Sequence, residues 1–149
     1  MQSPSNELGT SVREAFQSDA QRIASLALQL GYEVPVAHVE RRLRELNAGT
    51  AIFVAVVPRV GVVGWIGVRE STSLTSSHRA EIEGLVVEDE YRSNGIGNLL
   101  MDAAESWARH RGCTSLRLLS NIVRERAHQF YQRQGYEILK TEYVFQKQL

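Results

Sequence analysis

Two carboxylates and a glycine-bearing turn lie close together in the middle of this chain. Glu81 and Glu83 alternate along an apolar segment, and a turn with Gly95 and Gly97 follows it. A carboxylate can take a proton from a substrate or bind a cation. Glycines let backbone N–H groups approach an anion closely, and Arg92 adds a cation at the same turn. The residues predict a phosphate or pyrophosphate cradle beside an acidic pair; the alternative is a plain strand-to-helix turn.

The facing of the acidic pair follows from strand geometry. On a regular strand Glu81 and Glu83 share one face with Leu85 and Val87, and lie roughly 6.6 Å apart. A β-bulge before Val87 would change this facing. The alternative to a chemical role is that both carboxylates simply face water.

Spacing argues against several other chemistries. No Gly-x4-Gly-Lys-Ser/Thr run occurs, and Leu100 stands where a dinucleotide fingerprint needs a small residue. Cys113 is the sole cysteine and precedes an apolar strand, which predicts inert burial. We expect no metal, because the four histidines show no paired ligand spacing. They are His38, His78, His110 and His128.

Alternating helices and strands must position these residues. Ser18 and Gln21 fit a capping box before a helix that stops at Gly31, and a second helix runs from Val36 towards Gly49. Runs of β-branched residues predict the strands, and apolar residues at helical spacing predict the remaining helices. Strands are expected at 12–16, 51–57, 60–68, 80–87 and 115–120, helices at 95–111 and 123–134, and one or two closing strands within 136–149. The prediction is a loose tail over 1–10 and one mixed α/β domain over 11–149.

Composition sets further bounds. The chain has 149 residues, of which 43% are hydrophobic and 23% charged, and this excludes disorder. Lys plus Arg number 17, as do Asp plus Glu, so the balance favours neither nucleic acid nor an anionic membrane surface. No apolar run approaches the ~20 residues that a membrane helix needs. The first residues are not typical of a secretory signal, so a cytoplasmic protein is expected.

The glycine turn also resembles a known signature. Arg92-x-x-Gly95-x-Gly97, after a strand that ends in Leu85-x-Val87, is similar to the acetyl-CoA motif of the GCN5-related N-acetyltransferase (GNAT) family. That motif reads Gln/Arg-x-x-Gly-x-Gly/Ala. The resemblance implies a single GNAT-like α/β (α+β) domain. Its central sheet would be mixed but mostly antiparallel, with about four flanking helices.

Downstream residues extend the resemblance. The segment 120–136, with Asn121 and Tyr131, looks like the last strand and helix of that family, where an asparagine and a tyrosine lie beside the cofactor thiol. Two positions depart from the family pattern. Asp89 stands where proline is frequent, which the turn tolerates. Ser93 stands where glycine is frequent, which predicts a first turn without positive φ.

The resemblance implies direct transfer of acetyl from coenzyme A to an amine, with no covalent enzyme intermediate. The backbone N–H of Val87 would bind the oxyanion, and Tyr131 would protonate the leaving thiolate. Glu81 is favoured as the base and Glu83 as the binder of a cationic acceptor, with a water relay left open. The residues implied to bind acetyl-CoA are Leu85, Val86, Val87, Arg92, Ser93, Asn94, Gly95, Ile96, Gly97, Asn98, Asn121 and Tyr131.

Alternatives remain beside this prediction. Tyr131 has the alternative of core packing, and Asn121 that of capping a helix. A non-catalytic acyl-CoA-binding or sensing domain would keep the turn without needing Glu81 or Tyr131. A DNA-binding helix-turn-helix could use the basic residues of segment 41–44, although acidic neighbours offset them. The expected acceptor is a small cationic molecule, and dimerisation, common in the family, is a further expectation.

Overall fold

The computed structural model describes residues 7–149, which divide into two compact units, residues 7–118 and residues 119–149. Most of the expected tail, residues 1–6, lies outside the described residues. Thr10, the last residue of that predicted tail, is buried. Among residues 7–149, no helix is long and apolar enough to cross a membrane.

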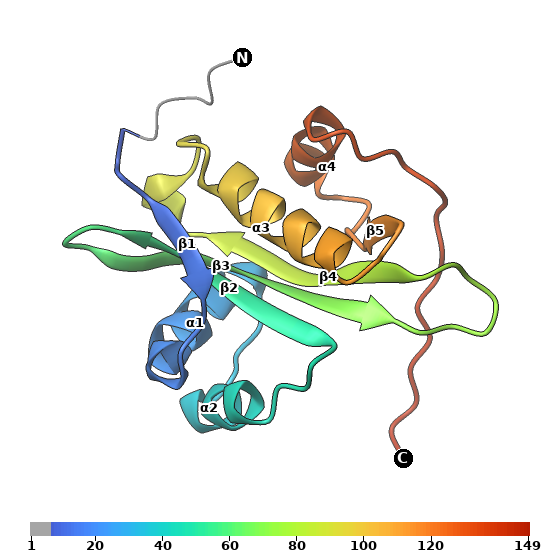
Figure 1. Ribbon diagram of the computed structural model, residues 1–149, viewed down its shortest axis with the longest axis horizontal. Coiled ribbons are helices and arrows are strands. Elements are labelled where there is room, and N and C mark those ends of the chain that lie inside the picture. The colour runs from blue at the N-terminus through green and yellow to red at the C-terminus, as the bar shows by residue number, and fades with distance from the viewer. Residues whose placement is uncertain (1–6) are drawn as a thin grey trace. The chain divides into compact units, whose positions relative to one another are not determined.

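A five-stranded sheet organises residues 7–118, in the order β1-β2-β3-β4-β5 (Figure 1). Neighbouring strands are antiparallel except β4 and β5, which are parallel, so the mixed, mostly antiparallel sheet is confirmed. The strand predicted at 115–120 from its apolar residues is expected to be buried, but β5 is short and only half-buried, because it is an edge strand that pairs with β4 alone. The bounds are β1 Ser11–Glu14, β2 Thr50–Val57, β3 Gly61–Ser71, β4 Arg79–Val87 and β5 Ser115–Leu118.

Two short helices, α1 (Ala20–Ala27) and α2 (Val36–Arg44), cover one face of this sheet (Figure 1). Their apolar residues recur at helical spacing, and burying that stripe against the strands stabilises both helices. Val39 and Leu43 of α2 pack against the core cluster from its edge. The cluster itself consists of Ile23, Leu26, Val54, Val62 and Val86.

The start of α1 differs from the predicted capping box. Helix α1 begins after Asp19, and the Asp19 carboxylate accepts the backbone N–H of Phe16 at 2.7 Å. The same carboxylate pairs with Arg13 at 2.7 Å. Asp19 is the residue before α1, and its carboxylate closes the 3₁₀ turn Gln17–Asp19 in front of the helix, so the predicted capping box of Ser18 and Gln21 is wrong.

Helix α3 (Ile96–His110) packs on the opposite face of the sheet and connects β4 to β5 (Figure 1). A parallel strand pair requires such a crossover. The helix lies directly against β3, because a Cβ at Gly64 would meet Leu100 Cδ1 at 3.2 Å. It starts after Gly95 and ends before Gly112, both at positive φ. Its buried residues are Ile96, Leu100, Met101, Ala104 and Ala108.

Residues 119–149 contain helix α4 (Glu125–Arg133), which stops before Gly135. The prediction of one or two closing strands within 136–149 is wrong, since the described chain contains no strand after α4. A strand exists only where a partner strand completes its hydrogen-bond ladder, and residues 119–149 contain no paired strands. Apolar side chains of the segment are exposed. They are Ile138, Leu139, Tyr143, Val144, Phe145 and Leu149.

Candidate active site

A β-bulge in β4 decides which of its side chains share a face. Gly84 pairs with Gly67 of β3 and Ile82 pairs with Val68, which leaves Glu83 as the extra residue. The Cβ of Glu83 lies 3.6 Å from the position that a Cβ would take at Gly67. Glu83 therefore points to the same face as Gly67, the face that α1 covers.

The bulge overturns one expectation about facing. Glu81 lies opposite Arg69 and shares the α1 face with Glu83, as predicted. Val86 packs in the core cluster of that same face, so its neighbours Leu85 and Val87 point to the opposite face. The predicted common face of both carboxylates with Leu85 and Val87 is wrong, because the extra residue shifts the alternation by one position.

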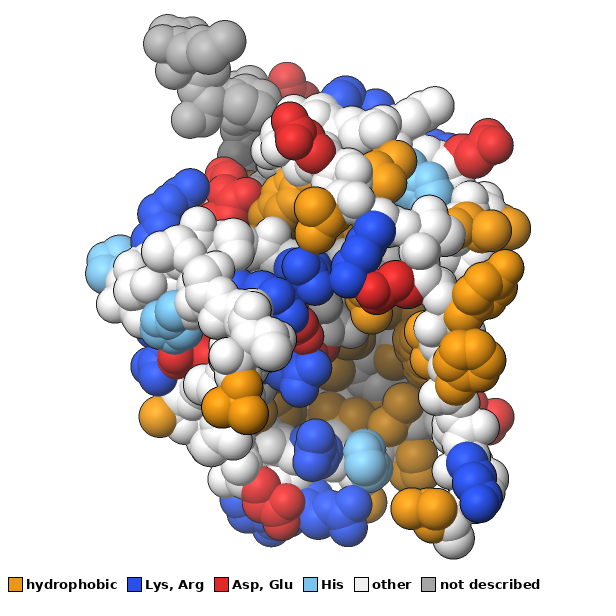
Figure 2. Space-filling view, turned by 90° about the vertical axis from the view of Figure 1, so that its right-hand side faces the viewer, with side chains coloured by type: hydrophobic (Ala, Val, Ile, Leu, Met, Phe, Trp, Pro, Cys, Tyr) orange, Lys and Arg blue, Asp and Glu red, His pale blue; other side chains and the backbone are white. Residues whose placement is uncertain are grey.

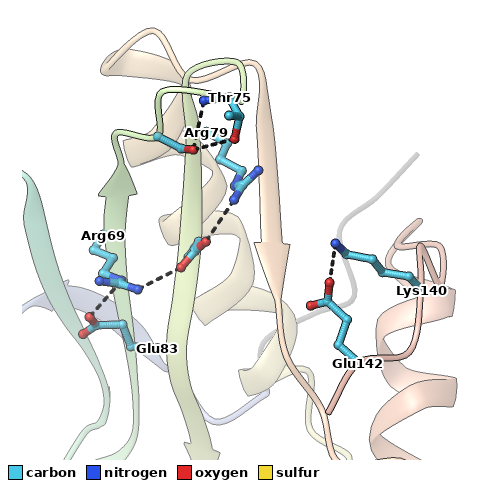
Figure 3. Close-up of polar contacts among 8 residues, drawn as sticks. Arg69, Thr75, Arg79, Glu83, Lys140 and Glu142 are labelled. Carbon is cyan, nitrogen blue, oxygen red and sulfur yellow. Dashed lines mark hydrogen bonds and ion pairs between the residues drawn. The ribbon is translucent and has the colours of Figure 1, made fainter. Parts of the chain in front are cut away.

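Both carboxylates belong to a charge network with two arginines (Figure 3). Arg69 Nη2 lies 3.0 Å from Glu81 Oε2, and Arg69 Nε lies 3.4 Å from Glu83 Oε1. Arg79 Nη2 lies 3.6 Å from Glu81 Oε1. Two positive charges thus balance two negative ones, so the acidic pair is less of a bare cation site than its sequence indicates.

Beyond the bulge, β4 offers backbone groups on one edge. The N–H of Glu88 donates to Val63 of β3 at 2.8 Å, and alternate residues of a strand point their N–H groups to opposite sides. The N–H of Val87 therefore points away from β3. On that side β5 pairs only with Arg79–Ile82, and no described strand pairs with residues 83–87. The predicted oxyanion donor lies on an open strand edge.

The turn after β4 is held by its own side chains. It begins with a single 3₁₀ turn, Asp89–Tyr91, which forms without the proline that the family often carries. Arg92 donates to the carbonyl of Val87 at 3.2 Å and pairs with Asp89 at 2.8 Å. The Asn94 amide donates to the carbonyls of Tyr91 and Arg92 at 3.0 and 3.1 Å. These contacts fix the path of the backbone into α3.

Ser93 contradicts the expectation of a turn without positive φ. Its φ is +66°, in the left-handed region that serine enters at a cost of roughly 1–2 kcal/mol. The two hydrogen bonds from the Asn94 side chain to the carbonyls of the two residues before Ser93 stabilise this geometry. The family's frequent glycine is explained by the same backbone conformation.

The N-terminus of α3 completes the turn. Gly95 is the N-cap residue of the helix at φ +77°, and glycine has no side chain that could cap the first N–H groups of α3. Nothing lies within 4 Å of the position that a Cβ would take at Gly95. The N–H groups of a helix's first turn and the positive end of the helix dipole attract an anion. The segment from Arg92 to Asn98 is therefore brought together as predicted, with open space in front of it.

Tyr131 lies in the second unit, on α4. Its ring makes edge contacts with Phe130 and Tyr136, at centroid distances of 5.3 and 6.2 Å. Burial raises the pKa of the Tyr131 phenol above its ordinary value of 10, and the charge of Arg124 opposes this shift. The phenol consequently keeps its proton at neutral pH, as a proton donor must.

Asn121 has a local structural role. Its side-chain oxygen accepts the N–H of Val123 at 3.1 Å, and its carbonyl contacts the His128 ring at 2.9 Å. This arrangement forms the turn before α4 rather than capping the helix itself, whose N-cap is Arg124. The amide nitrogen of Asn121 is the group left for a ligand.

Sequence reasoning did not single out the arginines of this site. Arg69, Arg79 and Arg117 come from three different strands, and only strand pairing brings them beside Glu81. The sequence did contain one signal for two of them. Arg69 and Arg79 stand at the ends of two largely apolar strand segments, on either side of the polar loop 72–78.

A second cluster also went unpredicted. One ligand atom from each of Glu70, His78 and Cys113 lies within 4.8 Å of the others. Glu70 is already bound by His78 and Arg111, which hold the pKa of its carboxyl below the ordinary range. Burial and the charge of Glu70 raise the pKa of the Cys113 thiol. These residue types are able to bind a metal, and the expectation of no metal stays a prediction.

Comparison with known proteins places this geometry in a family. The acetyltransferase (GNAT) family model matches residues 12–136. An aminoglycoside N(6')-acetyltransferase type 1 of Stenotrophomonas maltophilia is 28% identical over 137 residues, covering 89% of this chain and 88% of that protein. An aminoalkylphosphonate N-acetyltransferase of Salmonella typhimurium is 41% identical over 69 residues, covering 46% of this chain and 44% of that one.

A solved structure agrees on the fold. The aminoglycoside acetyltransferase AAC(6')-Iy, in complex with a bisubstrate analogue of coenzyme A, superposes with a TM-score of 0.80 at 19% identity. The match covers 94% of this chain and 99% of that one. Because the family model matches residues 12–136, most of its length, the chain belongs to the acetyltransferase (GNAT) family and is an N-acetyltransferase.

Proposed function

We propose that this chain transfers acetyl directly from acetyl-CoA to the amine of a small molecule, with the two halves of β4 serving the two substrates. Acetyl-CoA supplies the activated acyl group as a thioester. The residues proposed to hold it are the backbone edge Leu85–Val87, the turn from Arg92 to Asn98, and the side chains of Asn121 and Tyr131. The observation that carries this proposal is the open strand edge running into a helix N-terminus that begins at a glycine with open space beside it.

The turn suits the pyrophosphate of coenzyme A. The empty space in front of Gly95 leaves room for phosphate oxygens at the backbone, where a side chain would block them. The N–H groups of the first turn of α3 then donate to those oxygens. Arg92, half-exposed and held by Val87 and Asp89, adds a cation without having to be ordered on binding.

The backbone N–H of Val87 is the proposed oxyanion donor. As the amine attacks, negative charge develops on the acetyl oxygen, and a fixed donor there lowers the barrier. Pairing of β4 with β3 holds this N–H rigidly towards the open edge. The thioester and the donor then lie on the same edge as the proposed pyrophosphate turn.

The acidic pair is proposed to serve the amine. The sequence favours Glu81 as base, but two observations favour Glu83. Among residues 7–149, Glu81 is paired with two arginines, whereas Glu83 has a single ion pair and a more exposed side chain. Glu83 also lies two residues nearer to Val87 along β4. We therefore propose that Glu83 accepts the proton of the amine, directly or through water. Glu81 would instead orient the arginines.

Tyr131 is the proposed acid for the departing thiolate. Its burial keeps the phenol protonated, and the thiol of coenzyme A is a weak enough acid to benefit from a positioned donor. The N-terminal helices α1 and α2 would form one wall of the acceptor cleft. Positive and negative side chains are interspersed on the face drawn in Figure 2, which suits a small acceptor better than a polyanion.

Thiol release from acetyl-CoA, measured across a panel of amines, tests the function. We expect release that depends on the amine and yields the acetylated amine by mass spectrometry. Coenzyme A binding by calorimetry without amine-dependent release for any amine would instead support the non-catalytic acyl-CoA-binding alternative. A dimer and a cytoplasmic location remain predictions.

A further inference from the structure

Around Glu81, arginine side chains outnumber carboxylates. Arg69 of β3, Glu81 of β4 and Arg117 of β5 lie side by side in register. Directly paired residues of neighbouring strands point to the same face, so these three side chains form one row across the sheet. Arg117 is half-buried and has no hydrogen bond or ion pair with any of residues 7–149.

A second row lies two residues along the strands on the same face. There Arg79 stands between Ser71 of β3 and Ser115 of β5. The Arg79 side chain is only 17% exposed, and its Nε–H is buried without a partner in the described residues. A buried N–H without an acceptor is unfavourable, so an acceptor oxygen of a ligand that reaches it would stabilise it.

The local charge count follows from these rows. Three guanidinium groups, of Arg69, Arg79 and Arg117, face two carboxylates, of Glu81 and Glu83, which leaves an excess of one positive charge. Glu81 bridges Arg69 and Arg79 and so orients both of them (Figure 3). A polycationic acceptor would meet repulsion here, whereas an anionic oxygen group would find guanidinium and hydroxyl donors.

We propose that the acceptor carries, besides its amine, an anionic phosphonate or carboxylate group that binds to Arg69, Arg79 and Arg117. This rests on the proposed function, because Glu83 must receive the amine of the same molecule. The row of Arg69 and Arg117 lies two residues from Glu83, roughly 7 Å along β4. The Arg69 guanidinium reaches back towards Glu83, with Nε 3.4 Å from Glu83 Oε1, so a short alkyl spacer of two to four carbons is enough to join the amine and the anionic group.

Matched acceptors test the inference. We compare 3-aminopropylphosphonate and 4-aminobutyrate with butylamine and 1,4-diaminobutane, which lack the anion. At least one anionic acceptor is expected to exceed butylamine in kcat/KM by tenfold or more, mainly through KM. The better of the two identifies phosphonate or carboxylate as the preferred group. Butylamine or 1,4-diaminobutane performing as well as both anionic acceptors would overturn the inference.

Variants locate the effect. Arg117→Gln is expected to raise KM for the anionic acceptor about tenfold and bring its advantage over butylamine close to one. Arg117→Lys keeps the charge and should restore part of that advantage. Arg109→Gln, an exposed arginine on α3, is the matched control and should leave the ratio unchanged. An advantage that survives both Arg117→Gln and Arg79→Gln would contradict the proposed site.

A binding measurement separates this inference from the function. Propylphosphonate has no amine, and calorimetry should show it binding to the native chain and much more weakly to Arg117→Gln. Acetylation of butylamine without propylphosphonate binding would overturn the anion site and leave the function standing. Propylphosphonate binding with no thiol release from any amine would overturn the function, and the assignment of the anion to an acceptor with it.

Discussion

On one side of the bulge at Glu83, β4 presents charged side chains, and on the other side it presents backbone. The first half, from Arg79 to Ile82, pairs with strands on both edges and, together with the bulge residue Glu83, projects its charges from one face. The second half, from Leu85 to Val87, pairs with β3 alone and leaves its other edge open. One strand thus contains two kinds of site.

The difference has consequences for how each half tolerates change. A site made of backbone N–H groups depends on conformation, so it responds to substitutions that alter φ or fill space at glycine. A site made of side chains depends on residue type. It is damaged by substitutions that remove a charge, even when they leave the backbone unchanged. Such enzymes all use the same donor, coenzyme A, whereas their acceptors differ. A donor site built from backbone groups and an acceptor site built from side chains suit this difference, because substitutions change side chains more easily than the backbone.

The largest expected effect is on the side-chain half. Glu83→Gln keeps the size of the side chain but cannot take a proton, so turnover at neutral pH should fall by about 10²–10⁴-fold. Raising the pH should restore part of the rate, because more of the amine is then neutral before it binds. Initial rates between pH 7 and pH 10 check this. Glu81→Gln is the matched variant and should mainly raise KM for the acceptor; the opposite outcome would exchange the two roles.

A donor outside β4 sharpens the comparison. Tyr131→Phe removes only the hydroxyl, so turnover should fall by about 100-fold, or about 2.7 kcal/mol, with coenzyme A affinity nearly unchanged. Because burial raises the pKa of the phenol above 10, the native rate should show no loss from Tyr131 ionisation below pH 10. Tyr143→Phe, at an exposed tyrosine, is the control. Near-normal turnover of Tyr131→Phe would make this residue ordinary packing.

The boundary between the halves should be sensitive in stability. A Cβ at Gly84 would lie 2.8 Å from the Trp65 ring, which is rigid, so Gly84→Ala should lower the free energy of unfolding by about 1–3 kcal/mol. At Gly67 the new Cβ would meet the flexible end of Ile52 at 3.1 Å, and Gly67→Ala should cost less. Urea denaturation of both variants measures the difference. Equal losses would mean that the bulge itself is not tightly packed.

The smallest effect is expected on the backbone half. Gly95→Ala places a Cβ in the proposed phosphate space and forces alanine to φ +77°, so the dissociation constant of coenzyme A should rise about tenfold, or 1.4 kcal/mol. Gly31→Ala imposes the same strain at φ +87°, also with open space around it, but away from the turn. Calorimetry should show weaker binding only for Gly95→Ala. Similar affinities for both variants would argue against the cradle.

Local signals in the sequence were sufficient for most elements. Helix α3 was predictable because its apolar residues recur at helical spacing and glycines stand at both ends, and these are properties of neighbouring residues. The turn from Arg92 to Asn98 was predictable for the same reason. Ser93 was not, because hydrogen bonds from Asn94 stabilise a φ that serine rarely adopts by itself.

The facing of β4 and its charges depended on tertiary structure. The sequence by itself determined that Glu81 and Glu83 share a face, but the bulge that turns Leu85 and Val87 to the other face exists only in the pairing with β3. The row formed by Arg69 and Arg117 around Glu81 joins residues far apart in the chain. Likewise, closing strands were expected within residues 136–149, but this segment forms no strand within its unit. Strand pairing and register are long-range choices, so only the folded chain decides which side chains meet.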